Sequence, residues 1–156
     1  MRIILIGLGL FLSLSARAQL PDSSRICLPL HRIEVTSPYG FRVHPVTGKL
    51  QFHEGIDLRA HADPVLCIMN GVVLQTGYDR LLGIYIRVAH NRGIESLYGH
   101  LAIPLVIPGD TLSTGDVIAV SGNTGRSTGE HLHFSLSYRQ QYIDPLKFLL
   151  NLLHAY

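Results

Sequence analysis

The segment from 131 to 136, HLHFSL, constrains the fold most, because its polar and apolar residues alternate strictly. Successive residues of a β-strand point to opposite faces, so the pattern predicts a strand with one core face and one polar face. The apolar face would hold Leu132, Phe134 and Leu136. His131 and His133 would project together from the polar face, where two imidazoles can act at one site.

Two other segments carry residues that could join this pair. His53 and Asp57 lie in the run HEGID, and His100 lies in the run YGHL. Two imidazole nitrogens and one carboxylate oxygen suit a catalytic zinc ion that keeps a fourth position open. The HEGID run does not fit the His-Glu-x-x-His helix of another zinc-protease class, because its fifth residue is Asp57 and Gly55 interrupts a helix. The alternatives are a surface loop at 53–57 and ordinary histidines on a polar strand face.

The first 18 residues have the features of a secretory signal peptide. Met1-Arg2 gives a positive start, residues 3–14 are apolar, and Ala16-Arg17-Ala18 is a small-residue cleavage site. The apolar run is short for a membrane span. We expect cleavage before Gln19, an exported protein in the periplasm or outside the cell, and no stable membrane span afterwards. The alternative is a buried N-terminal helix.

Charge and cysteine content set further limits. The chain has 13 Lys and Arg against 11 Asp and Glu, and the two excess cations, Arg2 and Arg17, lie in the predicted signal peptide. A mature chain without excess positive charge gives no support for nucleic-acid binding.

Cys27 and Cys67 would meet an oxidising compartment after export, and spacing alone leaves a disulfide and two separate thiols equally open.

The rest of the chain reads as short strands separated by turns. A strand is expected over 32–36, and strands over 65–69 and 72–76 flank Asn70-Gly71, a strong hairpin signal. Further strands are expected over 84–90, 94–101 and 117–120, and a Gly/Ser/Thr-rich loop over 121–130 precedes His131. Only 145–153 has a helical pattern, with Asp144 as N-cap and Pro145 as first residue. The expected fold is mainly β, a compact antiparallel sandwich or barrel-like hybrid with a groove and one short C-terminal helix.

Several ordered motifs together resemble the lysostaphin/LytM-type zinc metallopeptidases, peptidase family M23. The similarity covers roughly residues 37–149. The matching stretches are Ser37-Pro38-Tyr39-Gly40 with Arg42 and His44-Pro45, residues 52–57 (FHEGID), the YGHL run, residues 121–129 (SGNTGRSTG), residues 131–134 (HLHF), and Asp144-Pro145 with Phe148-Leu149. The resemblance implies hydrolysis of peptide bonds in cell-wall peptidoglycan.

The resemblance also implies roles for individual residues. His53, Asp57 and His133 match the zinc ligands, and His100 and His131 match the two catalytic histidines. His44 falls where some relatives have a tyrosine that steadies the transition state, and a structural loop histidine is an equal alternative. The remaining histidines match no site motif: His31, His61, His90 and His154.

The chemistry of such a site is coherent on general grounds. Zinc makes water acidic enough to supply hydroxide near neutral pH, and a histidine can carry the proton to the leaving amine. We expect His131 to act as general base and then acid, and His100 to orient the water or stabilise the oxyanion; the two roles could be exchanged.

The expected domains are a signal peptide (1–18), an N-terminal segment (19–36), the catalytic domain (37–150) and a tail (151–156). Partners would be peptidoglycan peptides, with no nucleic acid, together with a cell-wall or secretion-machinery protein as a further option. Two other functions stay open. One is a non-catalytic LytM-like activator of another hydrolase, and the other is a β domain that binds wall glycan or a small molecule and holds its histidines as polar core.

Overall fold

The computed structural model describes residues 26–43 and 48–153. The predicted signal peptide (1–18), His44 and His154 lie outside the described residues. The strands are β1 (Val35–Ser37), β2 (Gly40–Val43), β3 (Leu50–His53), β4 (Ile56–Arg59), β5 (Pro64–Leu66), β6 (Gly71–Asp79), β7 (Gly83–His90), β8 (Ile94–Pro104), β9 (Thr111–Leu112), β10 (Val117–Ser121), β11 (His131–Tyr138) and β12 (Gln141–Ile143). A 3₁₀ turn, Asn91–Gly93, joins β7 to β8, and the helix α1 (Pro145–Leu153) follows β12.

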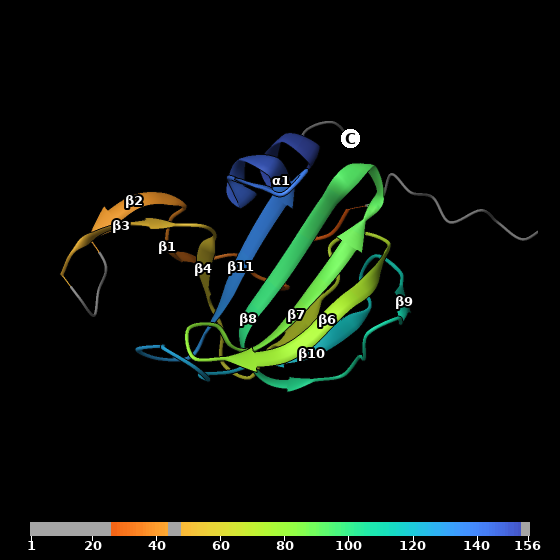
Figure 1. Ribbon diagram of the computed structural model, residues 1–156, viewed down its shortest axis with the longest axis horizontal. Helices are drawn as coiled ribbons and strands as arrows, with labels where there is room; N and C mark the ends of the chain where they lie inside the picture. Colours follow the sequence, from red (N-terminus) through yellow and green to blue (C-terminus); the bar gives the residue numbers. More distant parts are fainter. Residues whose placement is uncertain (1–25, 44–47, 154–156) are drawn as a thin grey trace, which may run out of the picture.

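Ten of the described strands form one antiparallel sheet. Its main order is β1-β4-β11-β8-β7-β6-β9, while β12 pairs with β11, and β10 pairs with both β8 and β5. The strands β2 and β3 form a separate two-stranded sheet, which projects to one side of the main sheet in Figure 1. A mainly antiparallel β fold with one short C-terminal helix is therefore confirmed.

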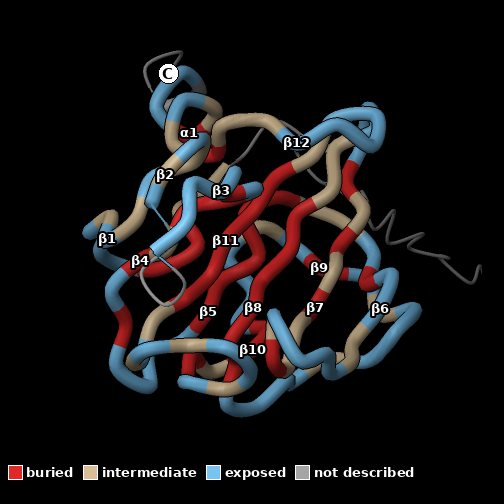
Figure 2. The backbone as a smooth tube through the Cα atoms, turned by 60° about the vertical axis from the view of Figure 1, so that its left-hand side comes forward, coloured by how far each residue is buried: buried red, intermediate tan, exposed pale blue. Residues whose placement is uncertain are grey.

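The core lies under β11 and β8, as the alternation in the sequence predicts. Leu132, Phe134 and Leu136 are completely buried, and the rings of Phe134 and Tyr98 lie 5.3 Å apart. These side chains share one apolar cluster with Val65 of β5 and residues of β10. Figure 2 shows the buried stretches running along β5, β8, β10 and β11. Because the apolar face of β11 packs on the core, the opposite face, which carries His131 and His133, points away from the core.

The helix α1 begins and ends where the sequence predicts. Asp144 caps it, because its Oδ1 accepts hydrogen bonds from the backbone N–H groups of Leu146 (3.1 Å) and Lys147 (3.2 Å). Leu149 is 1% exposed and belongs to the core cluster. Among the described helices, none combines the length and apolar character needed to cross a bilayer.

Three predicted strands are confirmed as β7, β8 and β10, with β8 continuing to Pro104. The strand predicted over 32–36 is wrong in its bounds and appears as Val35–Ser37, because pairing with β4 starts only at Val35.

The hairpin predicted at Asn70-Gly71 is wrong. The strand β5 pairs with β10, whereas β6 pairs with β7 and β9. Asn70 is instead held by another loop, since its Oδ1 accepts a hydrogen bond from the backbone N–H of Thr114 at 2.7 Å. Gly71 then pairs with His90, where a Cβ would lie 2.5 Å from the carbonyl oxygen of Ala89. This glycine therefore serves a close approach between strands and not a tight turn.

Cys27 and Cys67 are free thiols in the structure. The N–H of Cys27 donates to the oxygen of Ile68, and the N–H of Leu66 donates to the oxygen of Pro29, which places Leu28 directly opposite Cys67. Neighbouring residues of an extended chain point to opposite faces, so the side chain of Cys27 leaves the face opposite to that of Cys67. Each Sγ contacts a main-chain oxygen: that of Cys27 lies 3.1 Å from the oxygen of Cys67, and that of Cys67 lies 2.9 Å from the oxygen of Met69. Burial raises the pKa of the Cys67 thiol to about 12.

Candidate metal centre

His53, Asp57 and His133 meet at the edge of the main sheet. The register of β4 and β11 places Asp57 directly opposite His133, and His53 is the last residue of β3. Nδ1 of His133 lies 2.9 Å from Oδ1 of Asp57 and 3.2 Å from Nε2 of His53. Nε2 of His53 lies 3.3 Å from the same Oδ1. Three donor atoms from three strands therefore face one point.

Gly55 makes this approach possible. It lies in the link between β3 and β4, and a Cβ at this position would lie 2.9 Å from Cε1 of His133 and 2.5 Å from the carbonyl oxygen of Phe134. The glycine of the HEGID run is therefore needed because the chain passes directly over β11.

Main-chain carbonyl groups orient three of the four histidines in the centre. Because a carbonyl oxygen can only accept, each bonded Nδ1 carries the hydrogen and each Nε2 keeps a lone pair. The pairs are His53 with Pro38 (2.9 Å), His100 with Thr124 (2.8 Å) and His131 with Gly129 (2.8 Å). The Nε2 atoms of these rings are therefore available to a metal or to a substrate.

His100 and His131 lie beside the three donor atoms. Their ring centroids are 4.5 Å apart, and Nε2 of His131 lies 3.6 Å from Oδ1 of Asp57. His100 has a φ of 58°, in the left-handed region that residues with a Cβ seldom adopt. Its backbone N–H donates to the carbonyl oxygen of Leu82 at 2.6 Å, which holds this unusual conformation in place.

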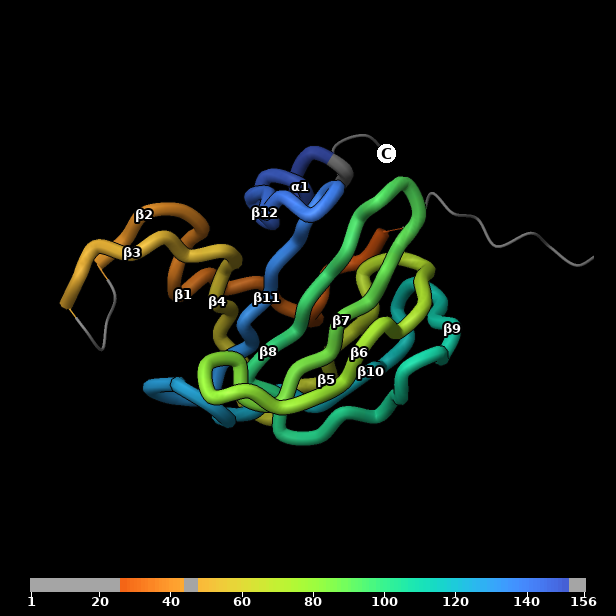
Figure 3. Tube along the Cα trace, in the orientation of Figure 1, coloured from red at the N-terminus to blue at the C-terminus, as the bar shows by residue number. Residues whose placement is uncertain are grey.

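Two loops form a wall of the centre. In Figure 3 the loop over 122–130, before β11, lies next to the turn between β6 and β7. The N–H of Arg126 donates to the oxygen of Leu81, and the Thr124 hydroxyl accepts from the N–H of Ile84 and donates to the oxygen of Leu101. These contacts fix the Thr124 carbonyl that orients His100. The Ser127 hydroxyl donates at 2.7 Å to the Gly129 carbonyl that orients His131. The centre opens into a hollow of about 380 Å³.

Burial and mutual contacts set the charge of the centre. Burial alone raises the pKa of Asp57, but the close contacts of its carboxylate with His133 and His53 outweigh burial and hold that pKa well below its usual range. Burial lowers the pKa of His133, and it lowers the pKa of His100 to about 4 against the opposing effect of the Thr124 carbonyl. An ionised carboxylate and neutral imidazoles are the states in which these groups bind metal.

The sequence did not single out a role for Arg42, which lies on β2 and lines the same hollow. Its Nη2 is 3.6 Å from Oδ2 of Asp57, and its Nε and Nη1 are buried without a hydrogen-bond partner among the described residues. Only the register of β2 and β3 brings this cation to the centre, so no local pattern could have revealed the contact.

The other described histidines lie elsewhere. His31 is exposed, and His61 is exposed with its Nδ1 3.1 Å from a carboxylate oxygen of Glu130. His90 is buried between Asn70 and Ser96. The structure thus brings together His53, Asp57, His100, His131 and His133.

The donor set fits zinc. Bond lengths of about 2.0–2.1 Å in a tetrahedral arrangement place neighbouring ligand atoms roughly 3.3 Å apart. The three separations here are 2.9, 3.2 and 3.3 Å. Two imidazoles and one carboxylate are also a typical set for a catalytic zinc site.

Comparison with known proteins identifies the family. The model of peptidase family M23 matches residues 51–145. The DD-carboxypeptidase/endopeptidase Mpg of Neisseria meningitidis serogroup B is 35% identical over 123 residues, which are 78% of this chain and 28% of that protein. The chain therefore belongs to peptidase family M23, and the resemblance seen in the sequence is confirmed. Its relatives are named metalloproteases and peptidoglycan DD-endopeptidases.

Solved structures agree with this assignment. A zinc-containing peptidase from Vibrio cholerae superimposes with a TM-score of 0.63 and 33% identity, over 72% of this chain and 39% of that one. The catalytic domain of lysostaphin from Staphylococcus simulans gives a TM-score of 0.68 and 30% identity, over 76% of this chain and 92% of that one. The chain spans about a quarter of the length of the curated relatives that it matches, 26% and 28% for two of them.

Proposed function

We propose that the protein is a zinc endopeptidase that hydrolyses peptide bonds in the cross-links or bridges of peptidoglycan. The observation that carries this proposal is the meeting of His53, Asp57 and His133 at one point, with His100 and His131 beside them. The relatives named as peptidoglycan DD-endopeptidases support the substrate class.

His53, Asp57 and His133 would hold the metal. Zinc, when bound, would make a water molecule acidic enough to attack near neutral pH and would polarise the substrate carbonyl. The Asp57 carboxylate reduces the charge of the centre from +2 to +1, which leaves a strong pull on that carbonyl. Arg42 holds Oδ2 of Asp57, so that Oδ1 faces the two histidines.

His131 would transfer the proton of the attacking water, and His100 would position that water. The Gly129 carbonyl leaves Nε2 of His131 with its lone pair, so this atom can take a proton from water and then donate it to the leaving amine. The Thr124 carbonyl likewise leaves Nε2 of His100 as an acceptor. As a neutral acceptor, His100 would orient the water in this proposal.

We also propose that the protein is exported before it acts. The support is the pattern of residues 1–18 and the location of peptidoglycan outside the cytoplasmic membrane. A periplasmic and an extracellular location are equally compatible with this pattern.

The function is tested by metal content and peptide release on the same full-length proteins. The Asp57→Ala variant should lose stoichiometric zinc by mass spectrometry and lose hydrolysis of defined muropeptides. The His131→Ala variant should keep zinc while its turnover falls about 100-fold or more, the usual contribution of a general base. His31→Ala, at an exposed histidine outside the centre, is the matched control and should behave as wild type.

Two results would contradict these assignments. Full zinc content in Asp57→Ala would remove Asp57 from the ligand set. A zinc-loaded wild-type protein that releases no peptide from sacculi or muropeptides would overturn the enzymatic proposal in favour of a non-catalytic activator.

A further inference from the structure

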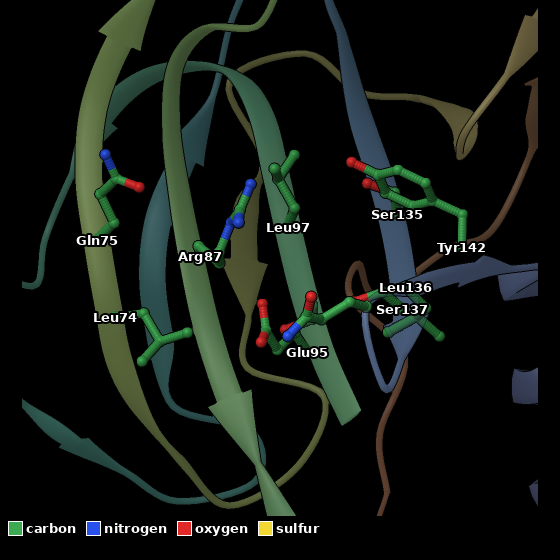
Figure 4. A pocket seen from close by; sticks show the side chains of 11 residues that line it. Leu74, Gln75, Arg87, Glu95, Leu97, Ser135, Leu136, Ser137 and Tyr142 are labelled. Atoms are coloured by element: carbon green, nitrogen blue, oxygen red, sulfur yellow. The ribbon is translucent and has the colours of Figure 1, made fainter. Parts of the chain in front are cut away.

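A second hollow of about 470 Å³ lies on the face of the main sheet that carries the metal centre. Figure 4 shows it from close by, with side chains from β6, β7, β8, β11 and β12 around it. Its lining includes Arg87, Glu95, Leu97, Ser135, Ser137 and Tyr142. The polar and charged groups of this lining have no role in the proposed chemistry.

The two hollows share one strand face. His133, Ser135 and Ser137 follow one another at two-residue spacing along β11, so their side chains leave the same side of the sheet. Ser135 lies opposite Leu97 on β8, which in turn lies opposite Arg87 on β7. The sheet beneath the metal centre therefore continues across β8 to Arg87 on β7.

Glu54 and Tyr142 connect the hollows at their rim. Glu54 lines the hollow of the metal centre, and Tyr142 lines the second one. The two side chains face each other closely enough for Glu54 to contribute to a raised pKa of Tyr142, of which burial is the main cause. The rims of the two hollows therefore meet at this contact.

Arg87 and Glu95 present two opposite charges to the second hollow. Among the described residues, neither side chain makes a hydrogen bond or ion pair, although each is only partly exposed. Arg87 pairs with Leu97, and Ala89 pairs with Glu95, which makes Arg87 and Glu95 diagonal neighbours about 7–8 Å apart. In Figure 4 both side chains stand in the hollow without meeting. This spacing leaves room for a ligand group between or above them.

The position of the pair relates it to a bound peptide. From His133 to Arg87 is two strand spacings, about 10 Å, and two residues along the strand, about 7 Å. An extended peptide covers this separation in three to four residues. The charged pair would therefore meet a substrate residue away from the scissile bond, where it can affect recognition without taking part in the reaction.

We propose that Arg87 and Glu95 form a subsite for a zwitterionic residue of the substrate peptide, with Arg87 binding its free carboxylate and Glu95 its free ammonium group. A guanidinium fork binds a carboxylate through two parallel hydrogen bonds, and a carboxylate accepts readily from an ammonium group. This subsite rests on the proposed peptidase function, because it assumes that a peptide occupies the groove. It adds the class of substrate: a peptide with a residue that carries both charges.

The subsite is tested by peptide binding, measured by calorimetry on the full-length, zinc-loaded His131→Ala protein. Three muropeptides are compared: one with the zwitterionic residue, one with its carboxylate amidated and one with its amine acetylated. Either modification should weaken binding about tenfold, the loss expected for one charged hydrogen bond. Adding Arg87→Gln should remove the effect of amidation only, and adding Glu95→Gln should remove the effect of acetylation only.

Arg32→Gln, which removes an exposed arginine outside both hollows, is the matched control and should discriminate as the parent does. Equal binding of the three peptides to the parent would overturn the subsite, even if a variant failed to fold. Unchanged discrimination in Arg87→Gln and Glu95→Gln would do the same. Cleavage of the unmodified peptide by the protein with His131 intact is scored separately, so an absence of cleavage with intact discrimination would overturn the peptidase proposal alone.

Discussion

The His90 side chain lies in a buried row of polar groups away from the metal centre. Its Nδ1–H donates to the carbonyl oxygen of Asn70 at 3.0 Å, and its Nε2 accepts from the Ser96 hydroxyl at 2.7 Å. The Ser96 Oγ in turn lies 3.2 Å from the hydroxyl oxygen of Tyr98. This arrangement suits a neutral imidazole, and burial accordingly lowers the pKa of His90 below its usual value.

His90 should therefore make stability depend on pH. A histidine whose pKa is lower in the folded state contributes fully above its unfolded pKa of about 6.5, and this contribution falls as pH drops below that value. We expect the free energy of unfolding of wild type to exceed that of His90→Gln at pH 7.5, and the difference to shrink by pH 5. Urea denaturation of both proteins at the two pH values, with zinc present, measures it. A difference that does not change with pH would contradict a neutral, buried His90.

At the scale of elements, α1 depends on one capping side chain. Asp144→Ala should lower the free energy of unfolding by about 1 kcal/mol, because two N–H groups of the first turn lose their acceptor. Chemical denaturation gives this value. Asp144→Asn is the matched control, since asparagine also caps helices well, and it should stay close to wild type. An equal loss in both variants would assign the effect to charge instead of capping.

Elements with a strong local pattern were predictable. The strand that carries His131 and His133 follows from the alternation of its side chains, and α1 follows from Asp144, Pro145 and an apolar periodicity. The hairpin predicted at Asn70-Gly71 was wrong because a local turn pattern does not indicate which strands pair with the two flanking strands. The strand before it pairs with β10, some 50 residues further along the chain.

The sequence allowed the residues of the site to be predicted, but not the contacts that orient them. The five clustered side chains come from motifs that stand out in the sequence. Their orientation depends on contacts that only the fold brings together: the Pro38, Thr124 and Gly129 carbonyls, the left-handed backbone of His100 and the Arg42 cation. Peptide oxygens are present at every residue, so no pattern of side chains indicates which ones will be used.

At the scale of the whole molecule, the metal centre connects two sheets. His53 belongs to the two-stranded sheet of β2 and β3, whereas Asp57 and His133 belong to the main sheet. Zinc binding should therefore stabilise the fold as a whole and not only the site. At free zinc about 100 times the dissociation constant, the gain is about 2.7 kcal/mol, on the order of 8 °C in Tm for a chain of this size.

Thermal unfolding followed by circular dichroism, with zinc and with a chelator, measures this gain. The Asp57→Ala variant should show no shift between the two conditions, and Asp63→Ala, an exposed carboxylate outside the metal centre, should shift as wild type does. A zinc-dependent shift retained in Asp57→Ala would place the stabilising ion at another site.

The three carbonyl groups that hold His53, His100 and His131 belong to the peptide backbone. Two of these carbonyls are held in part by side-chain hydroxyl groups of the same loop, those of Thr124 and Ser127. Exchanging either hydroxyl residue of this wall should therefore disturb the ring orientation of a histidine that the exchange does not itself replace.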